Sequence, residues 1–176
     1  MSLWQTLRSL PADSLIACAV MMWVGLFLPD YDQWLHLHRW ALTHSALPIL
    51  AVIWLRSPAI TAGLALGLAA HLSADLFPAA MRGTALIKVI PGLGLGRIAT
   101  YVWLTAHIII CAGVADRAAA QLGGTRLRVM LLGSALALAA SYVAFHSESV
   151  LTMVAMGSSF VLAQGRTIAR RLFLRR

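Results

Sequence analysis

The chain has 176 residues, of which 60% are hydrophobic and only 11% are charged. Soluble domains usually carry about 25% charged residues, so this composition excludes an ordinary soluble protein and predicts an integral membrane protein. The length favours a single transmembrane domain covering residues 1–176. A net charge of +8 would suggest nucleic-acid binding in a soluble protein. Here the distribution of arginines across a membrane accounts for the charge, and we expect no nucleic-acid partner.

The first half of the chain is predicted to form three apolar helices. The first begins near Pro11, with Asp13 in its first turn, where a carboxylate complements the helix dipole. The second covers about residues 40–55. A tight connection follows at Arg56-Ser57-Pro58, because proline cannot continue a hydrogen-bonded helix. The third helix covers residues 59–77.

Two glycines indicate how the third segment packs. Gly63 and Gly67 lie four residues apart within it. Small residues at this spacing form a flat face that permits close approach of another helix. We therefore expect a neighbouring helix to cross the third segment at these glycines.

The second half of the chain continues the apolar pattern. Residues 78–97 are rich in glycine and are predicted to form a loop or an interfacial segment. Three further apolar runs cover residues 98–115, 129–145 and 149–163, and a basic tail occupies residues 166–176. A membrane-spanning helix needs about 20 apolar residues. We predict an all-α polytopic membrane helix bundle with six apolar segments, of which four to six span the membrane.

The positive charges predict an orientation. If the six segments alternate in direction, residues 28–45 and 71–75 fall on the same membrane face. Four of the 14 lysine and arginine residues lie on that face, and the other ten lie on the opposite face. The positive-inside rule then places both termini and the basic tail in the cytoplasm. The face that carries residues 28–45 and 71–75 would then point to the periplasm or the cell exterior.

Acidic and histidine side chains gather on this outer face. Ionisable groups near a bilayer are costly unless they are paired or bind an ion, so their segregation predicts a single polar site with its motifs within residues 28–78. The groups concerned are Asp30, Asp32, Asp75 and Glu148 among the acids, and every histidine except His107.

Spacing indicates which of these groups can share an ion. His71 and Asp75 are four residues apart, so they lie on one face of a helix and can bind a common ion. Imidazole with carboxylate suits zinc, or manganese and iron where more oxygen ligands are present. Asp30 and Asp32 follow Pro29, which breaks the regular backbone, so both carboxylates can face a shared centre.

A third pair comes from the segment between these two. His38 and His44 are six residues apart and do not share a helical face. At least one of them must therefore reach the site from irregular backbone.

The order of these pieces resembles the YdjM-like family of bacterial inner-membrane metal-dependent hydrolases. The pieces are Leu-Pro-Asp-x-Asp at residues 28–32, His-Arg-xxx-Thr-His-Ser at residues 38–45 and His-xxx-Asp at residues 71–75. The chain departs from the family pattern in having a short insert at residues 33–37 and Trp40-Ala41-Leu42 in place of a shorter Gly-x spacer. The family arrangement is itself similar to zinc-dependent phospholipase C, in which His-xxx-Asp is a metal-binding element.

The resemblance implies a ligand set for a divalent metal, with zinc as the first choice, manganese or iron as alternatives, and one to three ions. The candidate ligands are Asp30, Asp32, His38, His44, His71 and Asp75. Asp30 or Glu148 would act as the general base, and Arg39 and Arg82 would hold an anionic head group, since guanidinium matches phosphate geometry. His36 and His146 are additional candidates.

The predicted function is metal-dependent hydrolysis of a phosphoester in a lipid or lipid-linked substrate, at the outer face of the bacterial inner membrane. Two alternatives remain at this point. One is a non-enzymatic membrane module whose metal is structural and supports assembly or partner binding. The other is a divalent-cation transporter, which would place ligands near mid-bilayer with polar paths on both sides.

Overall fold

The protein is described from a computed structural model, which covers residues 12–76, 81–90 and 92–123 together with positions 131, 133, 134 and 137. Its main helices are α2 (Ala12–Phe27), α3 (Leu47–Ile53), α4 (Pro58–Asp75) and α5 (Arg97–Leu122). Two short 3-10 helices, η1 (Pro29–Leu35) and η2 (Gly83–Ala85), and two short strands, β1 (Lys88–Ile90) and β2 (Leu93–Gly94), complete the described elements.

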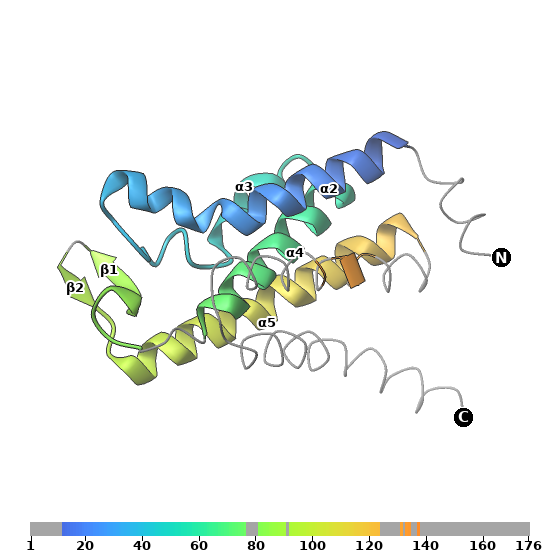
Figure 1. Ribbon diagram of the computed structural model, residues 1–176. Coiled ribbons are helices and arrows are strands. Elements are labelled where there is room, and N and C mark those ends of the chain that lie inside the picture. The colour runs from blue at the N-terminus through green and yellow to red at the C-terminus, as the bar shows by residue number, and fades with distance from the viewer. Residues whose placement is uncertain are drawn as a thin grey trace, which may run out of the picture.

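Helix α4 is the centre of the fold. It runs between α2 and α5 (Figure 1) and packs against both of them. Its residues from Ala62 to Ser73 are all buried, because the two neighbours cover it from opposite sides. A helix that is apolar on every face is expected where a helix is enclosed on all sides. Ser57 caps its first turn, with the side chain accepting a hydrogen bond from Ile60 N–H.

Glycines bring α2 and α4 into backbone contact, as their spacing predicts. A Cβ atom added at Gly63 would overlap the Cys18 carbonyl oxygen, and one added at Gly67 would overlap the Met22 carbonyl oxygen. Gly25 on α2 makes the reciprocal contact with the Leu64 carbonyl. Only glycine fits at such an approach, so the two helices lie close enough for polar atoms near their ends to meet.

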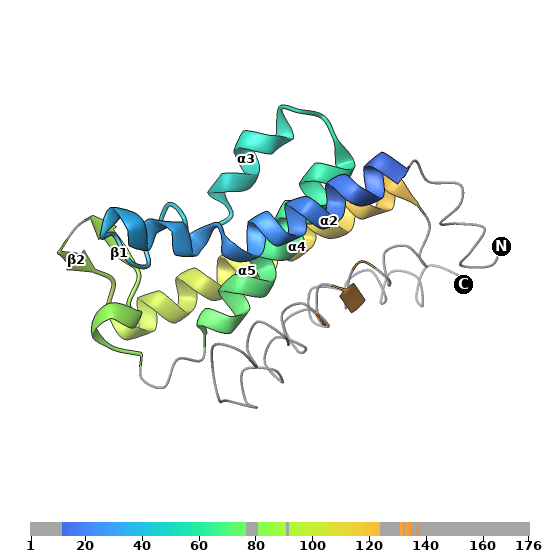
Figure 2. The ribbon, with the colours of Figure 1, turned by 45° about the horizontal axis from the view of Figure 1, so that its top comes forward.

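A small hairpin closes one end of the molecule. Strands β1 and β2 pair antiparallel, with Lys88 opposite Gly94. The other edge of β1 binds the loop before α3, where Ala41 N–H donates to the Lys88 carbonyl at 2.8 Å and Lys88 N–H donates to the Arg39 carbonyl at 2.9 Å. Helix α3 lies to one side of the layer formed by α2, α4 and α5 (Figure 2). The hairpin therefore fixes the path of residues 39–41 beside the end of α4.

The prediction of an all-α bundle with six apolar segments, four to six of them spanning, is wrong. Among the described residues, only α5, with 26 residues, is long and apolar enough to cross a membrane by length and composition. Helix α2 has 16 residues and α3 has seven. The apolar run in α4 is explained by burial between its neighbours, and hydropathy does not distinguish this environment from lipid.

Two local expectations also fail, and several others lie outside the described residues. The helix expected over residues 40–55 is confined to Leu47–Ile53, because residues 39–41 bind β1 instead. Residues 78–97, predicted to form a loop or an interfacial segment, contain the short strands β1 and β2. The apolar run at residues 149–163 and the basic tail at 166–176 lie outside the described residues, as does most of the run at 129–145.

Candidate metal centre

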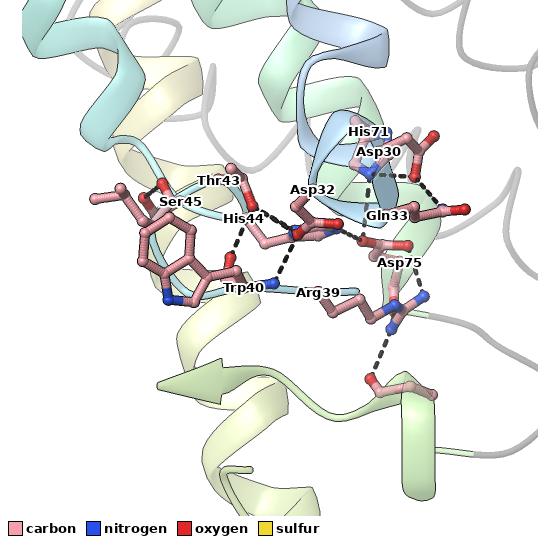
Figure 3. A network of polar contacts seen from close by, with 12 residues as sticks. Asp30, Asp32, Gln33, Arg39, Trp40, Thr43, His44, Ser45, His71 and Asp75 are labelled. Carbon is pink, nitrogen blue, oxygen red and sulfur yellow. Dashed lines mark hydrogen bonds and ion pairs between the residues drawn. The ribbon is translucent and has the colours of Figure 1, made fainter. Parts of the chain in front are cut away.

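Three predicted ligands from separate elements meet at the end of α4. Among the residues that the structure describes, Asp30, His44 and His71 each offer one ligand atom, and these atoms all lie within 4.8 Å of one another. Asp30 comes from η1, His44 from the loop before α3 and His71 from α4 (Figure 3). His44 and His71 are each 1% exposed, so the donors lie inside the protein. This group is a candidate metal-binding triad.

Asp75 adds a fourth donor to the triad. Its Oδ2 lies 3.3 Å from His44 Nε2 and 3.4 Å from His71 Nε2. Ligands held about 2.0–2.1 Å from a tetrahedral zinc ion lie about 3.4 Å from one another. Asp75 Oδ2 is buried and both imidazole nitrogens approach it, but neither contact has the geometry of a hydrogen bond, although buried polar atoms normally have a hydrogen-bond partner. A cation between the two imidazoles and this oxygen would satisfy it, so the donors fit a divalent metal.

The orientation of His71 is set by the backbone of α2. Its Nδ1 lies 2.7 Å from the Leu26 carbonyl oxygen, which can only accept a hydrogen bond, so Nδ1 carries the proton. The opposite nitrogen, Nε2, then faces the carboxylates, 3.8 Å from Asp30 Oδ1 and 3.4 Å from Asp75 Oδ2. Metal-binding histidines commonly donate their second ring N–H in this way. The close approach of α2 and α4 thus positions a ligand.

His44 lies between two carboxylates. Its Nδ1 is 3.2 Å from Asp32 Oδ2, and its Nε2 is 3.3 Å from Asp75 Oδ2. Burial of the imidazole alone would lower the pKa of His44, but the contacts with Asp32 and Asp75 and their negative charges raise that pKa to about 9. In the metal-free protein a proton therefore occupies the place beside Asp75 where a cation would bind.

The two carboxylates beside His44 are held ionised. Burial would raise the pKa of Asp75, but the charge of His71, the contacts with both imidazoles and the charge of Arg39 hold it well below its usual value. Burial would also raise the pKa of Asp32, but hydrogen bonds from His44, Trp40 and Thr43 lower that pKa below its ordinary value. Negative charge is therefore concentrated around the triad, as a divalent cation requires.

Arg39 is occupied by contacts within the protein. Its guanidinium binds Asp75 Oδ1 at 2.6 Å and donates to the Ala85 carbonyl at 2.7 Å and to the Asp75 carbonyl at 3.4 Å. Its backbone adopts a positive φ of 60°, which costs on the order of 1 kcal/mol for a non-glycine residue. The structure thus places Arg39 as a clamp that fixes Asp75 and joins the loop to η2, with its donors directed inward.

Loss of this clamp should destabilise the fold. We expect Arg39→Gln to lower the free energy of unfolding by about 2 kcal/mol, somewhat less than for a fully buried pair because the site is partly hydrated. The reason is that the Asp75 carboxylate would lose its charged partner. Denaturant unfolding measures this loss of stability. Arg82→Gln is the matched control, because Arg82 is exposed and its loss should change the free energy of unfolding by less than about 0.5 kcal/mol. Equal stability of the two variants would contradict the clamp.

The other predicted residues lie away from the triad or outside the described residues. His38 is half-buried and, among the described residues, makes no hydrogen bond or ion pair with the triad. Burial and the charge of Arg39 lower the pKa of His38, against the opposing charge of Asp32. His36 is exposed and ends η1 in a left-handed conformation. Glu148 and His146 lie outside the described residues.

Some groups that hold the site in place were not predicted from the sequence. The Thr43 hydroxyl donates to Asp32 Oδ2 at 2.8 Å, and Trp40 N–H donates to the same oxygen at 2.7 Å. The Trp103 indole N–H of α5 donates to the His44 carbonyl at 2.9 Å. The position of Thr43 next to His44 was the only available signal, because the contribution of α5 depends on tertiary packing.

The arrangement is able to hold one divalent cation between two imidazole nitrogens and carboxylate oxygens, at a point reached from the surface through Asp30. The Asp30 side chain is 33% exposed, against 1% for His71. Asp30 is therefore the most exposed of the donors, and the Asp75 side chain is 14% exposed. Comparison of the chain with protein-family models, with curated proteins and with solved structures gave no match.

Proposed function

We propose that the chain is a divalent-metal-dependent hydrolase of phosphoesters, with zinc as the metal. The observation that carries this proposal is the spacing of three donor atoms. Asp75 Oδ2 lies 3.3 Å from His44 Nε2 and 3.4 Å from His71 Nε2, and these distances suit one tetrahedral ion. Two imidazoles with carboxylate oxygens form a ligand set found in catalytic zinc sites. The resemblance of the three motifs to the YdjM-like family supports the same reaction class.

The chain's own residues supply the remaining parts of the reaction. A bound zinc ion would lower the pKa of a water molecule and polarise a phosphoryl oxygen. His44, His71 and Asp75 would hold the ion from the buried side. Asp30, at the open side, would take the proton from the attacking water through its carboxylate. Arg82, which is exposed beside η2, would bind the anionic phosphate in place of Arg39, whose donors are engaged.

A lipid or lipid-linked substrate is proposed from the surface around the site. Tyr31 and Trp34 on η1 are 61% and 83% exposed, and Ile90 and Leu93 of the hairpin are 55% and 57% exposed. The hairpin of β1 and β2 lies at one end of the molecule (Figure 1), and β1 binds residues 39–41, which lead into the loop that carries His44. Exposed aromatic and aliphatic residues are typical of a surface that meets the boundary between lipid and water.

We further propose that α5 anchors the protein in the bacterial inner membrane, with the triad on the exoplasmic side. The exposed residues Ile98, Val102, Ile109 and Ile110 give α5 an apolar outer face. Eight of the 14 lysine and arginine residues lie at Arg117 or after it, which favours a cytoplasmic side for the C-terminal end of α5. A reporter fused to the C-terminus should be accessible from the cytoplasm. An exoplasmic C-terminus would overturn this orientation.

The test of the proposed activity uses the full-length protein in mixed micelles. The purified protein should contain zinc and should hydrolyse bis-p-nitrophenyl phosphate or phosphatidylglycerol. A chelator should abolish turnover and added zinc should restore it. Asp30→Asn should lower turnover about 100-fold or more through loss of the proton acceptor, whereas Asp13→Asn, a carboxylate at the far end of α2, should not. A folded, zinc-loaded protein that hydrolyses neither substrate would refute the proposal.

Zinc affinity should rise with pH. The metal needs the neutral imidazole of His44, and the pKa of that group is raised to about 9, so at pH 7 zinc must displace a proton. We expect the zinc affinity to increase about tenfold per pH unit between pH 7 and 9 and to level off above that range. Competition with a chromophoric chelator measures this slope. A zinc affinity that does not change over this range would contradict the role of His44.

A structural metal is the second candidate function. It is favoured by the near-complete burial of His44 and His71 and by the origin of the donors in three elements. Structural zinc sites contribute directly to folding. This candidate predicts that metal removal unfolds the protein, whereas the hydrolase proposal predicts a folded but inactive metal-free form.

A further inference from the structure

Asp32 is the most completely enclosed carboxylate of the described residues near the triad. Its side chain is 0% exposed. All of its contacts converge on Oδ2, which accepts hydrogen bonds from Trp40 N–H at 2.7 Å and the Thr43 hydroxyl at 2.8 Å and lies 3.2 Å from His44 Nδ1. The Thr43 hydroxyl also lies 3.2 Å from His44 Nδ1 and 3.0 Å from the Trp40 carbonyl oxygen, so Asp32 and Thr43 together hold the Nδ1 edge of the His44 ring.

That edge is the one opposite to the triad. The two nitrogens of an imidazole ring point in divergent directions, and His44 Nε2 faces Asp75 Oδ2. A zinc ion about 2.1 Å beyond Nε2 would lie roughly 6 Å from Asp32 Oδ2, because the ring separates them. The second oxygen of Asp32 lies about 2.2 Å from the first, so it stays outside the distance of about 2.0–2.2 Å that a zinc ligand needs.

We propose that Asp32 is a positioning residue, which binds His44 Nδ1–H and thereby directs the His44 Nε2 lone pair at the metal without coordinating that metal. This inference rests on the metal of the proposed function. It replaces the role of metal ligand that the motif resemblance implies for Asp32. A carboxylate that accepts the second N–H of a metal-bound histidine fixes the ring and raises its basicity.

The two histidines of the triad are therefore oriented by different means. His71 donates to the neutral Leu26 carbonyl of α2, and His44 faces the charged carboxylate of Asp32. The charge of Asp32 makes His44 the stronger donor to the metal. Substitutions at the two positions should consequently weaken metal binding by different routes.

The wild-type protein tests the proposal without any substitution. The full-length chain is labelled with ¹⁵N-histidine and loaded with ¹¹³Cd²⁺ as the metal probe. We expect the NMR spectrum of His44 to show cadmium coupled to Nε2 and a proton on Nδ1. Coupling through Nδ1, or no coupling of His44 to cadmium, would overturn the proposal, because Asp32 could not then orient the ring as described.

A pair of variants tests the same point through the ligand set. Asp32→Asn should bind zinc about 10- to 100-fold more weakly, while the visible spectrum of its Co²⁺ form keeps the shape and intensity of the wild type. Thr43→Val, which removes one hydrogen bond to Asp32 and the hydroxyl contact with His44 Nδ1 but leaves the carboxylate, should have a smaller effect. A Co²⁺ spectrum that changes in Asp32→Asn as it does in Asp75→Asn, which removes a proposed ligand, would show that Asp32 is a ligand and would overturn the proposal.

These readouts use the metal alone and no substrate. If the protein bound metal with the expected His44 signature but hydrolysed nothing, the proposed activity would fail and the role of Asp32 would stand. If hydrolysis were observed but Asp32 proved to be a metal ligand, the proposed activity would stand and the proposed role of Asp32 would fail. If Asp32→Asn did not fold, the wild-type spectrum would still decide the matter.

Discussion

Replacing His71 with glutamine is expected to reduce zinc affinity about 1000-fold and to bring hydrolysis to background. His71 supplies Nε2 at the centre of the donor set, 3.4 Å from Asp75 Oδ2. Structural zinc sites bind with about 10–16 kcal/mol from four ligands, so one ligand accounts for roughly 3–4 kcal/mol, or two to three powers of ten. Zinc competition and turnover on the same preparation measure both effects.

His107→Gln is the matched control for this substitution. His107 also lies on a long helix, and its Nδ1 also contacts a backbone carbonyl, that of Trp103 at 2.9 Å, but it lies outside the triad. Its loss should leave zinc affinity and turnover within a few-fold of wild type. Equal losses in the two variants would show that the effect of His71→Gln comes from losing the contact between a histidine ring and a backbone carbonyl, and that it does not come from losing a metal ligand.

The same experiment separates the two candidate functions. If the metal is catalytic, His71→Gln should remain folded by circular dichroism while it loses turnover. If the metal is structural, the substitution should unfold the protein, because structural zinc contributes its binding energy to folding. Thermal unfolding with and without zinc distinguishes a catalytic metal from a structural one.

Gly67→Ala is expected to destabilise the protein by about 3 kcal/mol or more, although alanine is the better helix former. Alanine in an exposed helix gains about 1 kcal/mol over glycine, but here its Cβ would overlap the Met22 carbonyl oxygen. Overpacking of a tight core costs about 1–3 kcal/mol, and more where backbone must move. Separation of α2 from α4 would also move His71 away from the Leu26 carbonyl and weaken zinc binding.

The matched control is the same substitution at Gly113 on α5. A Cβ at Gly113 meets nothing within 4 Å among the described atoms, so Gly113→Ala should stabilise the protein by up to about 1 kcal/mol. Denaturant unfolding of the two variants under identical conditions compares them directly. A Gly67→Ala protein as stable as wild type would mean that α2 and α4 do not approach as closely as described.

Local patterns in the sequence were sufficient to predict several features of the structure. Residues 12–27 are helical, and the chain turns at residues 56–58 before α4, both as predicted. The spacing of His71 and Asp75 placed them on one face of α4, where their side chains meet. These features depend on caps, proline geometry and the helical repeat, which act over a few residues.

Other features were decided by tertiary structure. Composition predicted membrane-spanning segments where α4 is enclosed by α2 and α5, because hydropathy measures the side chains and does not identify their surroundings. The motifs indicated Asp32 as a metal ligand and Arg39 as a phosphate-binding residue, but the structure directs Asp32 to the far edge of His44 and Arg39 to Asp75. Which atoms such groups face is set by contacts between segments distant in the sequence, and no local pattern records those contacts.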